Sequence, residues 1–385
     1  MTSENNNFTY NPDVIDAPIQ IHTNEQKQSS YDDSFEINDI RSSPDFKGIS
    51  FSNFKKTDVK QKLIDCMLGE TIEPACYWCS ELLCAGHFSE VWEIILYYIS
   101  KHIHLGNPKI AIYVEMRYNN FKNIMNQGTF IADIDARNNQ NVRKLFAEII
   151  CVLSLSKRKP GFEPIKIKSS TDFDSTQIAT KLKADDVTYI QDIFKKKDPR
   201  ELYIALNEFA YALSEKGLNM ANACYWLEWC LEFETVCKKR KEKIFCEPRN
   251  YRVENKVRTN IIWIFWDVIM ECSAKKNNKI VDKIISSLLT LFTIKFTDAT
   301  PKKRRYLLYY AIEIITEQIN TNIDVLPDKT VIQNVTNSIN TIYKQIKKNE
   351  QAPKTEYLFN GLDKRKAIEK SIKQIELVNS MDPIL

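Results

Sequence analysis

Helical spacing of apolar residues is the feature that most constrains what this chain can fold into. This spacing places apolar side chains on one face of an α-helix. It is clearest in two sets, one comprising Ile280, Val281, Ile284, Ile285, Leu288, Leu289 and Phe292, the other comprising Val331, Val335, Ile339, Ile342 and Ile346. The strict alternation of apolar and polar residues that indicates strands is scarce. The sequence therefore predicts an all-α protein.

Three dipeptides predict where helices begin. Asn107-Pro108, Asp198-Pro199 and Thr300-Pro301 each place a good N-cap residue before a proline, whose fixed φ suits the first helical position. Together with the periodicity they predict about a dozen helices. We expect these near residues 58–68, 72–85, 88–103, 108–126, 138–157, 185–196, 199–215, 219–243, 253–274, 277–295, 301–320, 328–349 and 362–379.

Composition and punctuation divide the chain into five parts. The sequence is 43% hydrophobic, enough for one large or two ordinary domains. Its first fifty residues are rich in acidic residues, Asn and Ser and lack helical periodicity, so we expect disorder there. Pro160, Gly161 and Pro164 interrupt the helical pattern. We expect an acidic tail at 1–50, a helical module at 51–160, a linker loop at 161–184, a second helical module at 185–350 and a C-terminal helical extension at 351–385.

A short internal repeat suggests that the two modules are related. Ala75-Cys76-Tyr77-Trp78 returns as Ala223-Cys224-Tyr225-Trp226, each time within an apolar helical pattern. A true repeat would mean two similar helical units packed on one another. A solenoid-like array and two stacked helical bundles both remain open.

The sequence argues against the common catalytic folds. Its eight glycines are too far apart for a P-loop, a Rossmann turn or a nucleophile elbow, and its four histidines offer few bases for nucleophilic catalysis. We nominate no catalytic residue. The cysteines lie within helical patterns, which favours reduced thiols, and no apolar run is long enough to span a membrane.

One constellation could hold a metal ion. Cys76, Cys79, Cys84 and His87 provide three thiols and an imidazole, a ligand set that zinc accepts. Cysteine is also among the residues most often buried, and Cys76 and Cys79 share a helical stripe, so core packing explains them without a metal. We expect no cofactor, with zinc as the less favoured alternative.

Clusters of basic residues are the remaining functional signal. If they converge, they would bind phosphate groups or an acidic partner, with Tyr251 or Tyr306 available to stack on bases. Alternatively, they are solvated helix ends, where the helix dipole favours cations. The first cluster comprises Lys238, Lys239, Arg240, Lys241, Lys243, Arg249, Arg252, Lys256 and Arg258, the second Lys302, Lys303, Arg304 and Arg305, and the third Lys157, Arg158, Lys159, Lys166 and Lys168.

Two segments carry a resemblance to viral proteins. The sequence ACYWCSELLCAGHFSEVWEIILYYISKHIHLGNPKIAIYVEMR at 75–117 and the sequence ALNEFAYALSEKGLNMANACYWLEWCLEFE at 205–234 resemble uncharacterised helical proteins of large nucleocytoplasmic DNA viruses of protists and algae. The resemblance covers most of residues 60–320 and implies no particular activity. It implies a place in the host cytoplasm, a virus factory or a virion.

Our leading hypothesis is a non-enzymatic helical scaffold that binds protein partners through its tail and basic clusters. The alternative is a nucleic-acid-associated factor in viral replication, transcription or translation, which would bind through the same clusters. A zinc-binding protein is the third hypothesis.

Overall fold

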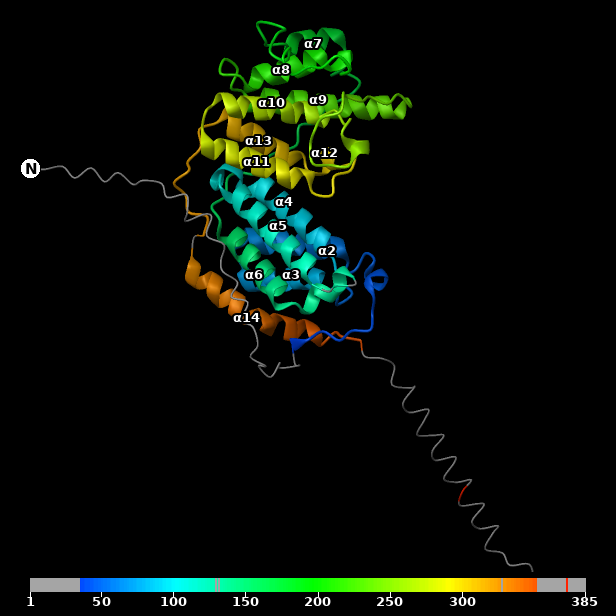
Figure 1. Ribbon diagram of the computed structural model, residues 1–385, viewed down its shortest axis with the longest axis vertical. Helices are drawn as coiled ribbons and strands as arrows, with labels where there is room; N and C mark the ends of the chain where they lie inside the picture. The colour runs from blue at the N-terminus through cyan, green and yellow to red at the C-terminus, as the bar shows by residue number, and fades with distance from the viewer. Residues whose placement is uncertain (1–34, 129, 131, 327, 352–371, 373–385) are drawn as a thin grey trace, which may run out of the picture.

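The all-α prediction is confirmed for the residues that the structure describes. This computed structural model describes residues 35–128, 130, 132–326, 328–351 and 372, and within them every regular element is helical apart from one isolated bridge between Ile49 and Lys55. The helices lie across the molecule one above another (Figure 1). They are α2 (Lys56–Leu68), α3 (Ile72–Cys84), α4 (Phe88–Tyr98), α5 (Ile110–Gln127), α6 (Gln140–Leu155), α7 (Ser175–Lys181), α8 (Tyr203–Leu213), α9 (Met220–Lys239), α10 (Ile262–Lys275), α11 (Lys279–Thr293), α12 (Thr300–Lys303), α13 (Arg305–Thr316) and α14 (Lys329–Lys347).

Local sequence signals explain where several of the helices begin. The side chains of Asn139, Asn278 and Asp328 cap α6, α11 and α14 by accepting hydrogen bonds from backbone N–H groups of the first turn. Thr300-Pro301 begins α12 at the predicted place, with Ala299 as the N-cap. The single helix predicted at 301–320 is divided, because α12 ends at Lys303 and α13 begins at Arg305. The other two proline signals precede their helices by a few residues, because α5 begins at Ile110 and a 3-10 turn at Arg200–Leu202 comes before α8.

The helix predicted at 185–196 is wrong, since this segment forms turns. Only Ile190 in it is buried, so a helix here would have no continuous apolar face to pack. Just before it, the Glu208 carboxylate of α8 accepts hydrogen bonds from the backbone N–H groups of Lys183 and Ala184 at 2.9 and 3.0 Å. The helix predicted at 362–379 lies almost wholly outside the described residues.

The two modules share one order of helix packing. In the first module α2 packs against α3, and α6 packs against both α3 and α5. In the second, α8 packs against α9, and α13 packs against both α9 and α11. The repeated tetrapeptide lies in the corresponding helices, α3 and α9. This common order supports the predicted duplication.

A continuous core joins the modules. Helix α11 packs against α5, and α13 packs against α4 and the π-helical turn η3 (Ile99–Ile103). Within this interface the Tyr310 hydroxyl donates to the carbonyl of Pro108 at 2.8 Å, and Nδ1 of the buried His104 lies 2.8 Å from the Glu313 carboxylate. The apolar cluster contains residues from both modules, so they are stacked parts of one core.

The predicted linker is part of the packed structure. Phe162 stacks on His104 with ring centroids 4.2 Å apart, and Phe173 meets Trp229 of α9 edge-on at 5.0 Å. The Trp229 indole also donates to the backbone carbonyl of Asp172 at 2.8 Å. These contacts seat the segment against both modules, although it contains only one short helix, α7.

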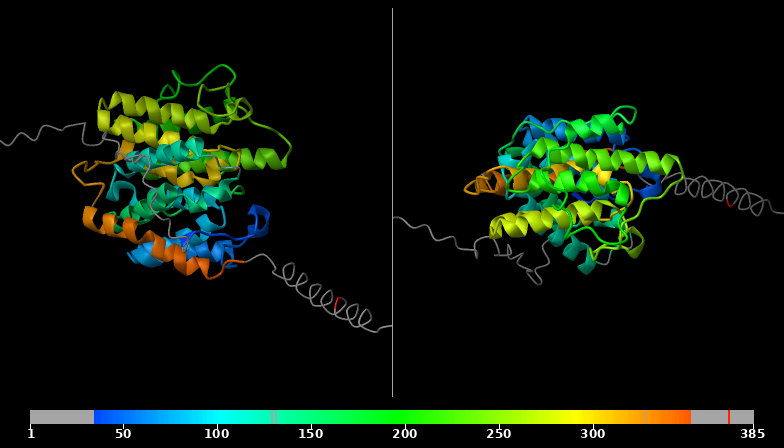
Figure 2. Two further views of the ribbon diagram at one scale, coloured as in Figure 1. Left: turned by 60° about the horizontal axis from the view of Figure 1, so that its bottom comes forward. Right: turned by 90° about the horizontal axis from the view of Figure 1, so that it is seen from above.

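Helix α14 lies against the first module, whereas the sequence assigned it to the second. It packs against α3 and α6, at the end of the stack farthest from α8 (Figures 1 and 2). Its Tyr343 is fully buried, and the Arg143 guanidinium of α6 lies 3.9 Å from the centre of that ring. The chain therefore returns to the first module after completing the second.

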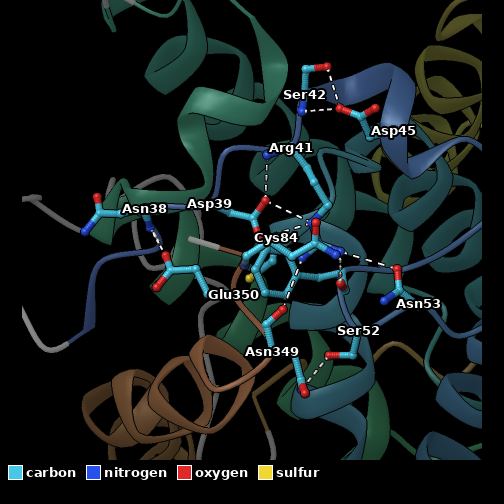
Figure 3. A network of polar contacts seen from close by, with 12 residues as sticks. Asn38, Asp39, Arg41, Ser42, Asp45, Ser52, Asn53, Cys84, Asn349 and Glu350 are labelled. Carbon is cyan, nitrogen blue, oxygen red and sulfur yellow. Dashed lines mark hydrogen bonds and ion pairs between the residues drawn. The ribbon is translucent and has the colours of Figure 1, made fainter. Parts of the chain in front are cut away.

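The N-terminal boundary also differs from the sequence prediction. Residues 1–34 lie outside the described residues, but Ile37, Phe46 and Phe51 are buried in the core, so packing starts well before the expected boundary at residue 50. Figure 3 shows the polar contacts that hold this segment beside the end of α14. Arg41 donates to the carboxylate of Asp39 and to the carbonyl of Asn349.

No helix among the described residues is long and apolar enough to cross a membrane.

Candidate binding site: a cationic edge and an adjoining aromatic pocket

The C-terminal end of α9 carries a dense group of exposed cations. Lys238 pairs with Glu234 one turn earlier at 2.8 Å. The cations that follow, Lys239, Arg240, Lys241 and Lys243, are exposed and form no ion pair within the described part of the chain. Their charges lie at the negative end of the helix dipole, which stabilises them. This end of α9 reaches beyond the neighbouring helices (Figure 1).

Helix α12 brings part of the second basic cluster to the same edge. Lys302 is exposed and lies 3.2 Å from Glu232 of α9. Glu232 precedes Lys238 by six residues, which is about 9 Å along a helix. The ion pair therefore brings Lys302 close to the C-terminal end of α9. We call this surface the cationic edge, comprising Lys238, Lys239, Arg240, Lys241, Lys243, Lys302 and Lys303.

Arg249 does not belong to this surface, contrary to the sequence prediction. Its side chain is buried, with Nη2 at 2.6 Å from Asp198 and Nε at 2.8 Å from Asp267. Burial would lower the pKa of this guanidinium, but the hydrogen bonds to both carboxylates hold it above its usual value. Its role is to join the loop after α9 to the rest of the second module.

Arg304 is likewise buried and internal, so its predicted role at the surface is also wrong. It donates to Glu93 of α4 at 2.5 Å and to the carbonyls of Phe292 and Ile294 at 2.8 and 2.7 Å. The last carbonyls of a helix have no partners within it, so Arg304 caps α11 while joining it to the first module. Its neighbour Lys303 remains exposed and lies 3.3 Å from the same Glu93.

The other predicted arginines are more peripheral. Arg305 is partly buried and pairs with the buried Glu228 at 3.1 Å. Arg258 donates to the carbonyl of Val253, and Arg252 is exposed in the same loop. In the third cluster, Arg158 binds Glu70 and the carbonyl of Leu68 at the end of α2. Of these arginines, Arg305 does touch the cationic edge, because its Nε donates to the backbone carbonyl of Lys302 at 3.2 Å.

The tyrosines considered for base stacking are engaged inside the protein. Tyr251 stacks on Trp263 at 4.8 Å and donates to Asp267 at 2.6 Å. Tyr306 meets the rings of Tyr97 and Tyr309 edge-on, at 5.7 and 5.8 Å. Neither is free to stack on a base without breaking these contacts.

The cysteine and histidine set has the surroundings of core residues. Cys76, Cys79 and Cys84 are buried in α3, and burial raises the pKa of the Cys76 thiol to about 12. Zinc binds thiolates, so this shift works against binding. Nε2 of His87 lies 2.8 Å from the carbonyl of Ile49. Among the described residues, no three His, Cys, Asp or Glu side chains are grouped so that they could hold a metal ion.

An aromatic pocket of about 200 Å³ adjoins the cationic edge. Its apolar wall comes from α4, α5 and the residue after α11, and comprises Phe88, Trp92, Tyr118, Phe121, Met125 and Ile294. Its polar lining comprises Ser89, Glu93, Lys122, Asn126, Asp133, Lys295 and Arg304. Glu93 is also the partner of Lys303. The pocket thus lies where the two modules meet, next to α12.

This pocket and the carboxylates that organise it leave little trace in the sequence. A tryptophan in an apolar helical pattern such as Trp92 is typical of a core residue, and Glu93 and Glu232 do not stand out because glutamates are common in helices. A local signal did exist, since an acidic residue lies within an apolar stripe at Glu93. Its partner Arg304 is 211 residues away, so the pairing could not be read from spacing.

A comparison of the chain with known protein families, with curated proteins and with solved structures found no match in any of the three.

Proposed function

We propose that this protein is a non-enzymatic interaction protein that binds an acidic segment of a protein partner at the cationic edge. The observation that carries the proposal is the row of four exposed cations at the C-terminal end of α9 and just after it, which form no ion pair within the described residues. Cations without internal partners are available to an acidic partner at little cost, because no existing ion pair has to break.

A protein partner is favoured over single-stranded nucleic acid by the aromatic residues. Non-specific single-strand binding combines a cationic groove with exposed aromatic side chains. Tyr251 and Tyr306 are engaged internally, which leaves Phe245, 54% exposed, as the large aromatic side chain nearest the edge in sequence. Binding to the phosphate backbone of a duplex is the second candidate, because it needs cations alone.

The test compares two variants of equal net charge. One changes Lys239, Arg240, Lys241 and Lys243 to glutamate, and the matched control makes the same change at Lys47, Lys55, Lys329 and Lys348, which are exposed elsewhere on the molecule. Labelled polyglutamate and a labelled DNA duplex are titrated into each by fluorescence anisotropy. We expect polyglutamate affinity to fall about tenfold or more in the first variant and to change little in the control.

The outcomes separate the two partner classes. If polyglutamate binds both variants with equal affinity, the proposal that an acidic segment binds at the cationic edge is wrong. Tighter binding of the duplex, with an affinity that falls about a thousandfold between ~50 and ~200 mM salt, would favour a nucleic-acid-associated factor. The role as a viral scaffold or virion component stays a prediction from the resemblance.

A further inference from the structure

The pocket beside α12 has the size and lining of a site for one aromatic ring. Its volume of about 200 Å³ exceeds the ~150 Å³ of an engineered apolar cavity that holds benzene. Trp92 and Tyr118 meet edge-on at 5.0 Å, and Phe88 and Phe121 stack at 5.7 Å. Aromatic rings favour such edge and offset contacts with a further ring.

A polar atom at this wall lacks a partner. Trp92 is 3% exposed, and its indole N–H has no hydrogen-bond acceptor among the described residues. A buried donor without an acceptor costs roughly 1–3 kcal/mol. The indole nitrogen is shielded from solvent, so a ligand reaches it only when the Trp92 ring turns toward the pocket. An oxygen acceptor brought there would then gain a hydrogen bond as well as apolar contact.

Ion pairs link the pocket wall to the cationic edge. Glu93 lines the pocket and lies 3.3 Å from Lys303, and the next residue, Lys302, lies 3.2 Å from Glu232 of α9. Lys122 and Lys295 also line the pocket and are exposed. Lys122, Lys295, Arg304 and the adjacent Lys303 therefore surround the pocket together with two carboxylates, Glu93 and Asp133. The excess of cations is complementary to acidic residues that flank a bound side chain.

We propose that this pocket binds a tyrosine side chain from the acidic segment that the cationic edge binds. The proposal rests on the proposed function and specifies the partner as an acidic segment with an aromatic anchor. The tyrosine ring fills the pocket and contacts Phe121 and Tyr118. Its hydroxyl oxygen accepts the hydrogen bond of the Trp92 indole.

The experiment compares two peptides on the full chain. In one, a tyrosine is flanked on both sides by glutamates, and in the other alanine replaces that tyrosine. We expect the tyrosine peptide to bind about tenfold more tightly, because an aromatic side chain is removed from water. Met125→Trp, which places a second indole in the pocket, should abolish this difference. Asn123→Trp, exposed on α5 outside the pocket, should preserve it.

A spectroscopic readout locates the tyrosine. In protein labelled with 5-fluorotryptophan, the Trp92 signal is assigned with Trp92→Phe and followed by ¹⁹F NMR. It should shift with the tyrosine peptide and stay fixed with the alanine peptide. If the tyrosine peptide binds more tightly than the alanine peptide but the Trp92 signal does not shift, the tyrosine ring binds elsewhere. This outcome would overturn the proposed tyrosine pocket.

The two proposals fail in different ways. One outcome is that both peptides bind with equal affinity, and that changing Lys239, Arg240, Lys241 and Lys243 to glutamate weakens both. This would overturn the tyrosine pocket and leave the proposed function intact. If neither peptide binds, or if reversal changes neither affinity, the proposed function fails and the pocket assignment fails with it.

Discussion

Buried arginines in this protein connect segments that are distant in sequence, and Arg249 is the clearest case. The Arg249 side chain is 2% exposed and forms ion pairs with Asp198 and with Asp267 of α10. The Asp198 side chain is fully buried. A charge buried without its partner costs far more than an exposed ion pair contributes. The basic loop after α9 is therefore held by an arginine that resembled, in sequence, a surface cation.

We predict that Arg249→Ala lowers the free energy of unfolding by about 3–5 kcal/mol, because it leaves the Asp198 carboxylate buried and unpaired. Arg252→Ala, three residues later and exposed, should change it by less than about 0.5 kcal/mol. Denaturant titration of both variants measures the difference. Equal effects would mean that the Arg249–Asp198 pair contributes no more than a surface contact.

At the scale of elements, the N-terminal segment and the end of α14 form one unit. The backbone N–H of Ile40 donates to Gln351, and the backbone N–H of Gln351 donates to Asp39 at 2.9 Å. Arg41 stacks over the rings of Phe46 and Phe51, at 4.7 and 4.8 Å from their centres (Figure 3 shows its polar contacts). Burial would raise the pKa of the Asp39 carboxyl, but hydrogen bonds from Arg41 and Gln351 keep it lowered.

We predict that Arg41→Ala loosens this unit without unfolding the modules. The substitution removes the hydrogen bonds to Asp39 and Asn349 and the stacking on both phenylalanines. Amide hydrogen exchange should increase in residues 37–51 and at the C-terminal end of α14, whereas α9 keeps its protection. Unchanged exchange in residues 37–51 would show that burial of Ile37 and Phe46 holds the segment by itself.

At the scale of the whole molecule, the modules share too much core to be independent. Helix α13 contacts α4, η3, α9 and α11, and so belongs to both modules. Elements that share one core unfold together when neither can bury its apolar face alone.

We predict a single unfolding transition. Leu63→Ala in α2 and Phe209→Ala in α8 lie in different modules and are fully buried, so each should destabilise the protein by about 2–5 kcal/mol. Each substitution should shift the same transition. Hydrogen exchange measured in both modules follows that transition. Two transitions, with each substitution affecting only one of them, would contradict the shared core.

The sequence by itself determined which segments are helical, because caps and apolar periodicity are local. The Asn278 cap and the stripe from Val281 to Phe292 are both contained within a few turns of one helix. The repeated tetrapeptide also predicted that two modules are built alike. Residues 185–196 are one exception, since turns replaced a helix that had little apolar surface to bury. The short helix α7 formed in the predicted linker loop, and α10 begins at Ile262, where a helix was expected from residue 253.

Only the tertiary structure decided which charged residues face solvent and which helices meet. Arg304 and Lys303 are adjacent in sequence, yet one is buried against Glu93 and the other is exposed. Their difference arises from α4, a helix more than 200 residues earlier in the chain. The convergence of α9 and α12, the pocket lined by Trp92 and the return of α14 to the first module have the same origin. Each depends on packing between distant segments, and local spacing does not encode which distant surface a helix will bury.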